Sequence, residues 1–305
     1  MKKGFVVKST GSWYLVRLAD GDLVECRIRG RFRMKGIRTT NPVAVGDVVA
    51  VETGSEDNVI TAIEPRRNYI IRRSTNLSKE SHIIASNVDQ AMLIVTVNHP
   101  VTSPVFIDRF LASAEAYNIP AILIFNKSDI YDEEDRDLAE GLMIIYRRAG
   151  YSCHIVSAAT GENMEAVRKL LQGKTTVLSG LSGVGKSTFI NCIEPGLHLK
   201  TAAISDAHDA GRHTTTFAEM FSLDNGGFVI DTPGVRSFGM VDMKKEEISH
   251  FFPEIFACGG QCRFSDCTHT HEPGCAVREA VETGEVSESR YASYLSMLEE
   301  SGKYR

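Results

Sequence analysis

A glycine-rich segment in the middle of the chain has the composition of a phosphate-binding loop. It reads G-x-x-x-x-G-K-S over residues 180–187 and directly follows the apolar residues 175–178. Glycines let the backbone turn tightly, so that its N–H groups face phosphate oxygens, and the helix that follows presents its positive N-terminus. We expect Lys186 to bridge the β- and γ-phosphates of a nucleotide and Ser187 to bind Mg²⁺. The expected phosphate-binding residues are Gly180, Leu181, Ser182, Gly183, Val184, Gly185, Lys186, Ser187 and Thr188.

A second polar motif, Asn126-Lys127-Ser128-Asp129, directly follows the apolar residues 121–125. An aspartate at the carboxyl end of a strand can accept hydrogen bonds from the N1–H and the 2-amino group of guanine, two donors that adenine does not offer. We expect Asn126 and Lys127 to brace the neighbouring loops and to pack on the base. Asp129 thus predicts a guanine nucleotide and argues against an ATPase or a nucleotide kinase.

Two further segments supply the remaining expected contacts to GTP or GDP and its Mg²⁺. Ser157 and Ala158 follow the predicted strand 153–156, where their backbone could meet guanine O6. Asp231 begins an Asp-Thr-Pro-Gly motif after another apolar strand. This motif places a carboxylate near the water shell of the Mg²⁺ and the Gly234 N–H near the γ-phosphate.

Residues 211–216, with the sequence Gly-Arg-His-Thr-Thr-Thr, are the expected switch segment of this site. We expect Thr215, in preference to Thr214, to complete the Mg²⁺ shell together with Ser187. The alternative is that these threonines simply begin a strand.

The residue after the Asp-x-x-Gly motif bears on the rate of hydrolysis. Ras-like proteins carry a glutamine there, which orients the attacking water, whereas this chain carries Val235. An imidazole can orient or deprotonate water at neutral pH, so His213 is the expected catalytic residue beside Lys186. The alternatives are that His213 is an ordinary surface histidine or that a partner completes the site.

The order of these motifs along the chain is unusual. The guanine-binding tetrad precedes the phosphate loop, whereas in an ordinary small GTPase the phosphate loop comes first. Such an order indicates a circularly permuted GTPase. The segment after Gly234 then runs directly into a C-terminal module, so loss of the γ-phosphate could reorient that module.

Cysteines and histidines gather near the C-terminus. Seven cysteines are too few for a disulfide scaffold in a chain of 305 residues, and their clustering favours a metal site. Three thiolates and one imidazole suit a closed, structural Zn²⁺ site. Cys258 and His271 could replace a member of the set, and reduced structural cysteines are the alternative. The expected ligands are Cys262, Cys267, His269 and Cys275.

The middle of the chain alternates strand-like and helix-like segments, which predicts a mostly parallel α/β sheet. Cysteines lie between two further helices that we expect in the C-terminal part. The predicted strands are 90–97, 121–125, 153–156, 175–178 and 227–230, and the predicted helices are 104–117, 133–149, 164–171, 186–192, 244–257 and 277–297.

The N-terminal residues predict a small all-β domain with a polyanionic partner. Residues 1–65 contain about five short strands with turn signals between them, which suits an OB-type barrel, with an SH3-like barrel as the alternative. Residues 1–40 hold ten lysines and arginines against three acidic residues, a net charge of +7, and the overall charge of −5 leaves −12 for the remainder. A solvated charged surface is the alternative to nucleic-acid binding.

Composition and hydropathy indicate a cytoplasmic, multidomain protein. The longest apolar run, residues 91–97, has the length of a buried strand, and no signal peptide is recognisable, so we expect no membrane contact. The expected domains are an OB-type barrel (1–65), a circularly permuted α/β P-loop GTPase (66–240) and an α-helical zinc-binding module (241–305). We expect a monomer.

Over its whole length, this combination of motifs resembles the RsgA (YjeQ) family, bacterial circularly permuted GTPases of the small ribosomal subunit. The resemblance implies a factor for late maturation of the 30S subunit that contacts 16S rRNA and whose GTP hydrolysis the subunit stimulates. It also implies that His213 matches the family's candidate catalytic histidine. The alternative is a nucleotide-dependent RNA-binding scaffold in which hydrolysis is incidental.

Overall fold

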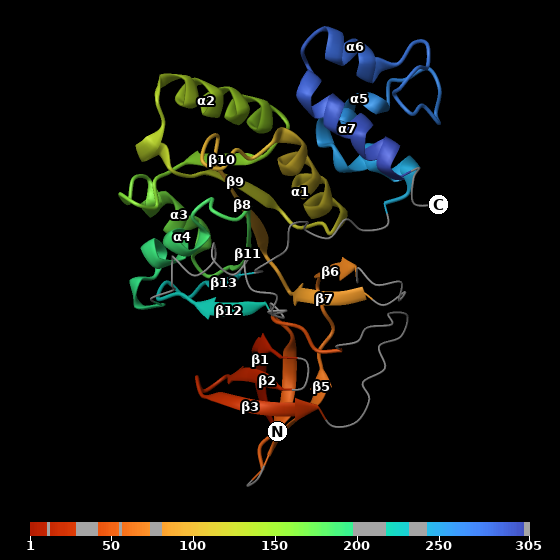
Figure 1. Ribbon diagram of the computed structural model, residues 1–305. Coiled ribbons are helices and arrows are strands. Elements are labelled where there is room, and N and C mark those ends of the chain that lie inside the picture. The colour runs from red at the N-terminus through yellow and green to blue at the C-terminus, as the bar shows by residue number, and fades with distance from the viewer. Residues whose placement is uncertain are drawn as a thin grey trace, which may run out of the picture.

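The computed structural model describes residues 1–10, 13–28, 42–54, 57–73, 81–197, 218–231 and 243–301. Along the chain it forms an all-β domain, a central sheet with helices, and a helical C-terminal module (Figure 1). Within the described ranges, no helix is both long enough and apolar enough to span a bilayer. The expected site residues outside the described part are His213, Thr214, Thr215 and Gly234.

The N-terminal domain is a closed five-stranded barrel, which confirms the predicted OB-type fold. Its order is β1-β2-β3-β5-β4, and β4 pairs back with β1. Along β2, Tyr14, Val16 and Leu18 are buried at every second position, because alternate side chains of a strand point to opposite faces. The strands are β1 (Lys2–Ser9), β2 (Tyr14–Leu18), β3 (Leu23–Ile28), β4 (Val48–Glu52) and β5 (Asn58–Ile63).

The central sheet has the order β10-β9-β8-β11-β13-β12, in which every neighbouring pair is parallel except β12 with β13. All six residues of β8 are buried, as expected for a strand covered on both faces. The predicted alternation of strands and helices is confirmed. The strands are β8 (Gln90–Val95), β9 (Ala121–Phe125), β10 (Ser152–Ile155), β11 (Thr175–Ser179), β12 (Glu219–Ser222) and β13 (Phe228–Asp231).

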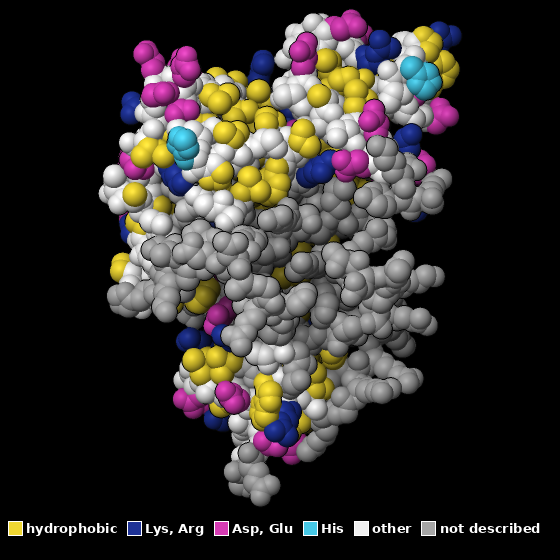
Figure 2. Space-filling view, in the orientation of Figure 1, with side chains coloured by type: hydrophobic (Ala, Val, Ile, Leu, Met, Phe, Trp, Pro, Cys, Tyr) yellow, Lys and Arg dark blue, Asp and Glu magenta, His cyan; other side chains and the backbone are white. Residues whose placement is uncertain are grey.

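Helices cover the two faces of this sheet and create two cores. Phe110 of α1 and Met143 of α2 pack with Leu93 on one face, whereas Val167 of α3 and Phe189 of α4 lie in the core on the other. Figure 2 shows that hydrophobic side chains also reach the surface above α1 and α2. The helices are α1 (Pro104–Ala116), α2 (Glu133–Arg148), α3 (Met164–Leu171) and α4 (Lys186–Ile193).

Two joints connect the barrel to the central sheet. Strand β1 pairs with β12 at Lys8 and Glu219, whose side chains form an ion pair of 3.0 Å, so the two sheets are one continuous sheet of eleven strands. At the second joint, the buried Asp47 pairs with Arg66 at 2.5 Å. Ser86 donates to the same carboxylate at 2.6 Å. Ser86 ends β7 (Ser81–Ser86), which pairs with β6 (Tyr69–Arg73) in a separate small sheet.

The C-terminal module corrects the prediction of two long helices. The first is interrupted at Pro253, which lacks an N–H and holds Phe252 in an extended conformation (φ −121°, ψ 94°). The second is interrupted by a loop at Gly284, whose φ of 75° lies outside the right-handed helical region. The resulting elements are η4 (Lys245–Phe251), α5 (Pro253–Gly259), α6 (Ala276–Glu282) and α7 (Glu288–Ser301).

A buried arginine attaches this module to the central domain. Arg290 of α7, 1% exposed, donates to Asp108 of α1 at 2.8 Å and to the two oxygens of Glu254 of α5 at 2.7 and 3.0 Å. Its guanidinium also lies 4.7 Å from the ring centre of Phe252. Burial raises the pKa of Asp108 although the Arg290 charge opposes this shift, so the carboxylate depends on its partner.

We predict that Arg290→Ala lowers the free energy of unfolding by about 3–5 kcal/mol, because Asp108 would remain as a buried charge without its cation. The matched control is Arg27→Ala, since Arg27 is exposed and lies 3.7 Å from Asp57. Arg27→Ala should lower the free energy of unfolding by less than about 1 kcal/mol. Urea denaturation followed by circular dichroism measures both, and equal losses would contradict the role of the buried pair.

Candidate functional site

The motifs that are scattered along the chain meet at one edge of the central sheet. Asn126 follows β9, Ser157 follows β10, Gly180 follows β11, and Asp231 ends β13. These strands are parallel, so their carboxyl ends lie together, and Leu178 of β11 is the register partner of Asp231. Ligands of open α/β sheets bind at this edge.

The phosphate loop depends on glycine at two tightly packed positions. A Cβ on Gly180, whose φ is 148°, would lie 2.6 Å from the carbonyl oxygen of Ile94. A Cβ on Gly185, whose φ is 96°, would lie 2.6 Å from Nδ2 of Asn126. The loop opens α4 at Lys186, which is the strand–loop–helix arrangement that phosphate binding needs. The loop and the first turn of α4 also contain Leu181, Ser182, Gly183, Val184, Ser187 and Thr188.

The lysine of the phosphate loop is hydrogen-bonded to carbonyl oxygens of the loop itself. Lys186 Nζ donates to the carbonyl oxygens of Gly180 and Leu181 at 2.8 and 2.7 Å. Burial lowers its pKa, and the charge of Asp231 opposes this shift. A bound phosphate would offer the ammonium a stronger, charge-assisted hydrogen bond than these carbonyls do.

Asn126 connects three loops of the site through one side chain. Its Nδ2 donates to the Val184 carbonyl of the phosphate loop at 2.9 Å, and its Oδ1 accepts from the Ala158 N–H at 3.0 Å. The neighbouring Lys127 has a φ of 70° and donates from Nζ to the carbonyl of His99 at 2.6 Å. Asn126 and Lys127 therefore brace the neighbouring loops, as expected, through these hydrogen bonds.

Two residues of the tetrad are held by side-chain bonds that the motifs did not predict. Ser157 donates from its hydroxyl to Oδ1 of Asp129 at 2.5 Å, whereas the sequence suggested only a backbone role for it. Ser128 donates to Glu162 at 2.7 Å. Both partners lie about thirty residues away in the chain, at separations of 28 and 34 positions, so no local pattern signals them.

The edge also offers oxygen atoms for a magnesium ion. Ser187 lies in the first turn of α4, and Asp231 is the last residue of β13, which pairs with β11. Hydroxyl and carboxylate oxygens are the ligands that Mg²⁺ accepts beside water and nucleotide phosphates. A third expected ligand, Thr215, lies outside the described residues.

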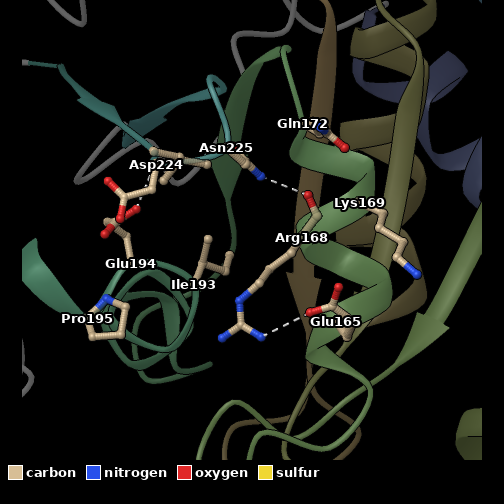
Figure 3. Close-up of a pocket in the computed structure, with 10 residues that line it drawn as sticks. Glu165, Arg168, Lys169, Gln172, Ile193, Glu194, Pro195, Asp224 and Asn225 are labelled. Carbon is tan, nitrogen blue, oxygen red and sulfur yellow. Dashed lines mark hydrogen bonds and ion pairs between the residues drawn. The ribbon is translucent and has the colours of Figure 1, made fainter.

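A hollow of about 280 Å³ lies outside the nucleotide-binding motifs (Figure 3). It lies between α3, the end of α4 and the turn that joins β12 to β13. Asn225 of this turn donates to the Arg168 carbonyl at 2.9 Å, and the Asp224 N–H donates to Glu194 at 2.8 Å. Glu194 and Asp224 lie on one side of the hollow, whereas Glu165, Arg168 and Lys169 of α3 lie on the other (Figure 3). The two hydrogen bonds hold the β12–β13 turn against the two helices.

The C-terminal module brings together the four expected metal ligands. The donor atoms of Cys262, Cys267, His269 and Cys275 all lie within 4.8 Å of one another. Nδ1 of His269 is 3.5 Å from the sulfurs of Cys262 and Cys275, which are 3.9 Å apart. Bonds of about 2.3 Å to sulfur and about 2.0 Å to nitrogen place the ligands of a tetrahedral Zn²⁺ about 3.5–3.8 Å apart. The cluster therefore has the size of a tetrahedral metal site, and Cys258 and His271 are outside it.

Helix α7 supports the backbone of this cluster. Tyr291 donates to the carbonyl of His269 at 2.5 Å, and Tyr294 donates to that of Thr268 at 2.8 Å. Burial lowers the pKa of His269, which favours the neutral imidazole that binds metals. Because α7 also carries Arg290, one helix links the metal cluster to the central domain.

Comparison with known proteins covers the whole chain. The family model for the RsgA GTPase matches residues 63–241, and the model for the RsgA N-terminal domain matches residues 3–60. The chain is 58% identical over 306 residues to the small ribosomal subunit biogenesis GTPase RsgA of Bacteroides fragilis, covering 99% of both chains. It is 55% identical to the protein of the same name from Porphyromonas gingivalis, covering 99% of this chain and 98% of that one.

Two solved structures share the fold. YjeQ from Thermotoga maritima superposes with a TM-score of 0.81 at 37% identity and covers 100% of this chain and 99% of its own. YloQ, described as a circularly permuted GTPase, has a TM-score of 0.75 at 30% identity and covers 100% of this chain and 96% of its own. The permutation inferred from the order of the motifs is thereby confirmed.

We predict that purified protein binds one metal ion per chain and that Cys262→Ser lowers this content several-fold, because the tetrahedral set loses a thiolate. Cys258→Ser is the matched control, since Cys258 is outside the cluster and should keep the metal. Elemental analysis of dialysed protein measures the content. Equal metal loss in both variants would contradict the four-residue set.

Proposed function

The chain belongs to the RsgA GTPase family, and we propose that it hydrolyses GTP on the small ribosomal subunit during late maturation of that subunit. The observation that carries this proposal is the contact of Asn126 with the phosphate loop and with Ala158. It joins the expected guanine-binding and phosphate-binding segments into one site. The relatives' name, small ribosomal subunit biogenesis GTPase, supplies the partner.

In the proposed complex, the tetrad binds the base and the phosphate loop binds the phosphates. Asp129 accepts from guanine N1–H and the 2-amino group, and Ser157 orients its carboxylate. A bound Mg²⁺ would be held by Ser187 and Thr215, with Asp231 acting through water, and it would offset the negative charge of the phosphates. The Gly234 N–H would contact the γ-phosphate.

Hydrolysis proceeds in this proposal by in-line attack of water on the γ-phosphorus. A new P–O bond forms to the water oxygen, the bond to the β–γ bridging oxygen breaks, and GDP leaves with the electron pair. The proton displaced from the water passes to an oxygen of the released phosphate. Lys186 stabilises the charge that develops on the phosphoryl oxygens, and a bound Mg²⁺ would supply further positive charge there. His213 orients the water, because Val235 has no polar group for this task. The 30S subunit stimulates the reaction by completing this arrangement.

The metal of the C-terminal cluster is proposed to be Zn²⁺. Three thiolates and one imidazole form a soft, closed, four-ligand set, which favours zinc over the harder Mg²⁺ and leaves no position for a substrate. Bound there, the ion would stabilise the loop that carries its ligands, as structural zinc sites do.

The barrel is proposed to contact 16S rRNA. Five of the ten basic residues in 1–40 lie in the described part of the barrel, where Lys2 pairs with Asp20 at 2.7 Å and Lys3 with Glu64 at 2.7 Å. The other five lie within 29–41, outside the described residues. On the barrel surface, Arg27 stacks over the ring of Trp13 at 4.0 Å, a planar pair of the kind on which bases stack. We place this activity in the cytoplasm and propose a monomer.

We predict that purified 30S subunits raise GTP turnover at fixed Mg²⁺ and salt, and that His213→Ala removes most of this stimulation, about a hundredfold in rate. His154→Ala is the control, because His154 lies on β10 and is bonded to Ser152, away from the phosphate loop. The rate of phosphate release is measured for the wild type, His213→Ala and His154→Ala, each with and without 30S subunits. Stimulation retained in His213→Ala would move the catalytic group elsewhere, and no stimulation at all would favour the RNA-binding scaffold.

A further inference from the structure

A tyrosine outside every recognised motif closes the guanine-binding loop. The hydroxyl of Tyr131 donates to the carbonyl oxygen of Asn126 at 2.6 Å. This bond joins the first residue of the tetrad to a residue five positions later, so it encloses the tetrad. We call residues 126–131 the tetrad loop.

The same hydroxyl fixes the tetrad loop to the neighbouring strand. It accepts from the Val97 N–H at 3.4 Å, and Val97 follows β8. The ring of Tyr131 is 5% exposed and belongs to the core that contains Phe125 of β9 and Met143 of α2. Tyr131 is therefore held by three elements, as is the buried Asn126 that it contacts, whereas Asp129 of the tetrad is exposed.

The hydroxyl of Tyr131 has a raised pKa. Burial raises the pKa of Tyr131 to about 12, with the nearby carboxylates of Asp135 and Asp129 adding to the effect and the bond from Val97 opposing it. The group therefore donates to Asn126 across the physiological pH range.

Asn126 is the residue through which Tyr131 can act on the nucleotide. Its carbonyl is held by Tyr131, and its side chain bridges Val184 and Ala158. A shift of the Asn126 backbone would misplace both bridges and also Asp129, three positions later in the same closed loop. A pocket that is ordered before the ligand arrives binds more tightly, because no ordering cost is left to binding.

We propose that Tyr131 is a positioning residue for guanine recognition, which holds the tetrad loop in its binding-competent form without touching the nucleotide. This inference rests on the proposed assignment of the tetrad to the base. Removal of the hydroxyl leaves the Asn126 carbonyl and the Val97 N–H without this partner, and the free protein relaxes towards loop forms that bind poorly. The apparent dissociation constant rises in proportion as the competent fraction falls.

The test compares Tyr131→Phe with Tyr117→Phe. Tyr117 is half-buried at the end of α1, its hydroxyl is hydrogen-bonded to the backbone of Ile71, and burial raises its pKa to about 12 as well. The two variants lose the same atom from similar surroundings, but only Tyr131 contacts the tetrad loop. Melting temperatures check that both variants are folded.

We expect Tyr131→Phe to raise the dissociation constants of GDP and GTP by the same factor, about tenfold, with kcat at saturating GTP unchanged. The preference for GDP over IDP should fall, because IDP lacks the 2-amino group that Asp129 recognises. Isothermal titration with GDP and IDP, and steady-state turnover, supply these values. Tyr117→Phe should bind like the wild type.

The outcomes separate this inference from the proposed function. A wild-type protein that shows no preference for GDP over IDP would overturn the assignment of the tetrad itself. A selective wild type with unchanged affinity in Tyr131→Phe would overturn the role of Tyr131 alone. The role of Tyr131 would also be overturned if Tyr117→Phe lost nucleotide affinity to the same extent, or if Tyr131→Phe lowered only kcat.

Discussion

The functional site depends on the parallel register of β10, β9, β8, β11 and β13, which brings the four loops that carry the motifs to one edge of the sheet. Strand β8, buried at every position, is the centre of this arrangement. Neighbours in space, and not neighbours in the chain, determine the pocket, so the chain can be cut and rejoined without moving its residues. Permutation then leaves the site intact and changes only what is attached: a barrel before β8 and a metal-binding module after β13.

The barrel is attached to the strand pair nearest the expected magnesium site. Lys8 of β1 pairs in register with Glu219 of β12, and Glu219 in turn pairs with Asp231 of β13. Asp231 pairs with Leu178 of β11, which precedes the phosphate loop. One row of residues therefore runs across four strands from the barrel to the phosphate loop. The opposite end of the β12–β13 hairpin is held by Glu194 and by the Arg168 carbonyl. A displacement of this hairpin would be transmitted directly to β1.

Local patterns were sufficient for the five parallel strands of the central sheet, its helices and the grouping of the metal ligands, because hydrophobic periodicity and ligand spacing are properties of short segments. The antiparallel strand β12 (Glu219–Ser222) was not predicted. The two C-terminal helices were predicted as continuous although Pro253 and Gly284 signalled breaks. Pairs distant in sequence could not be predicted at all: Asp108 and Arg290 are 182 positions apart, and neither residue belongs to a motif. The hydrogen bonds from Ser157 to Asp129 and from Ser128 to Glu162 could not be predicted for the same reason, since they form only in the assembled fold.

The ion pair between Arg290 and Asp108 fixes the position of the metal-binding module more than the chain connection to β13 does. The module follows β13 in sequence, which suggested that loss of the γ-phosphate would reorient it. Arg290, however, anchors it to Asp108 on α1. Helix α1 itself follows a loop in which Pro100 lies 3.5 Å from the Cβ position of Gly183 and His99 accepts from Lys127. Rotation of the module alone would leave a buried carboxylate without its cation, which is costly. The module and α1 should therefore move as one body, and the nucleotide pocket should act on the module through α1.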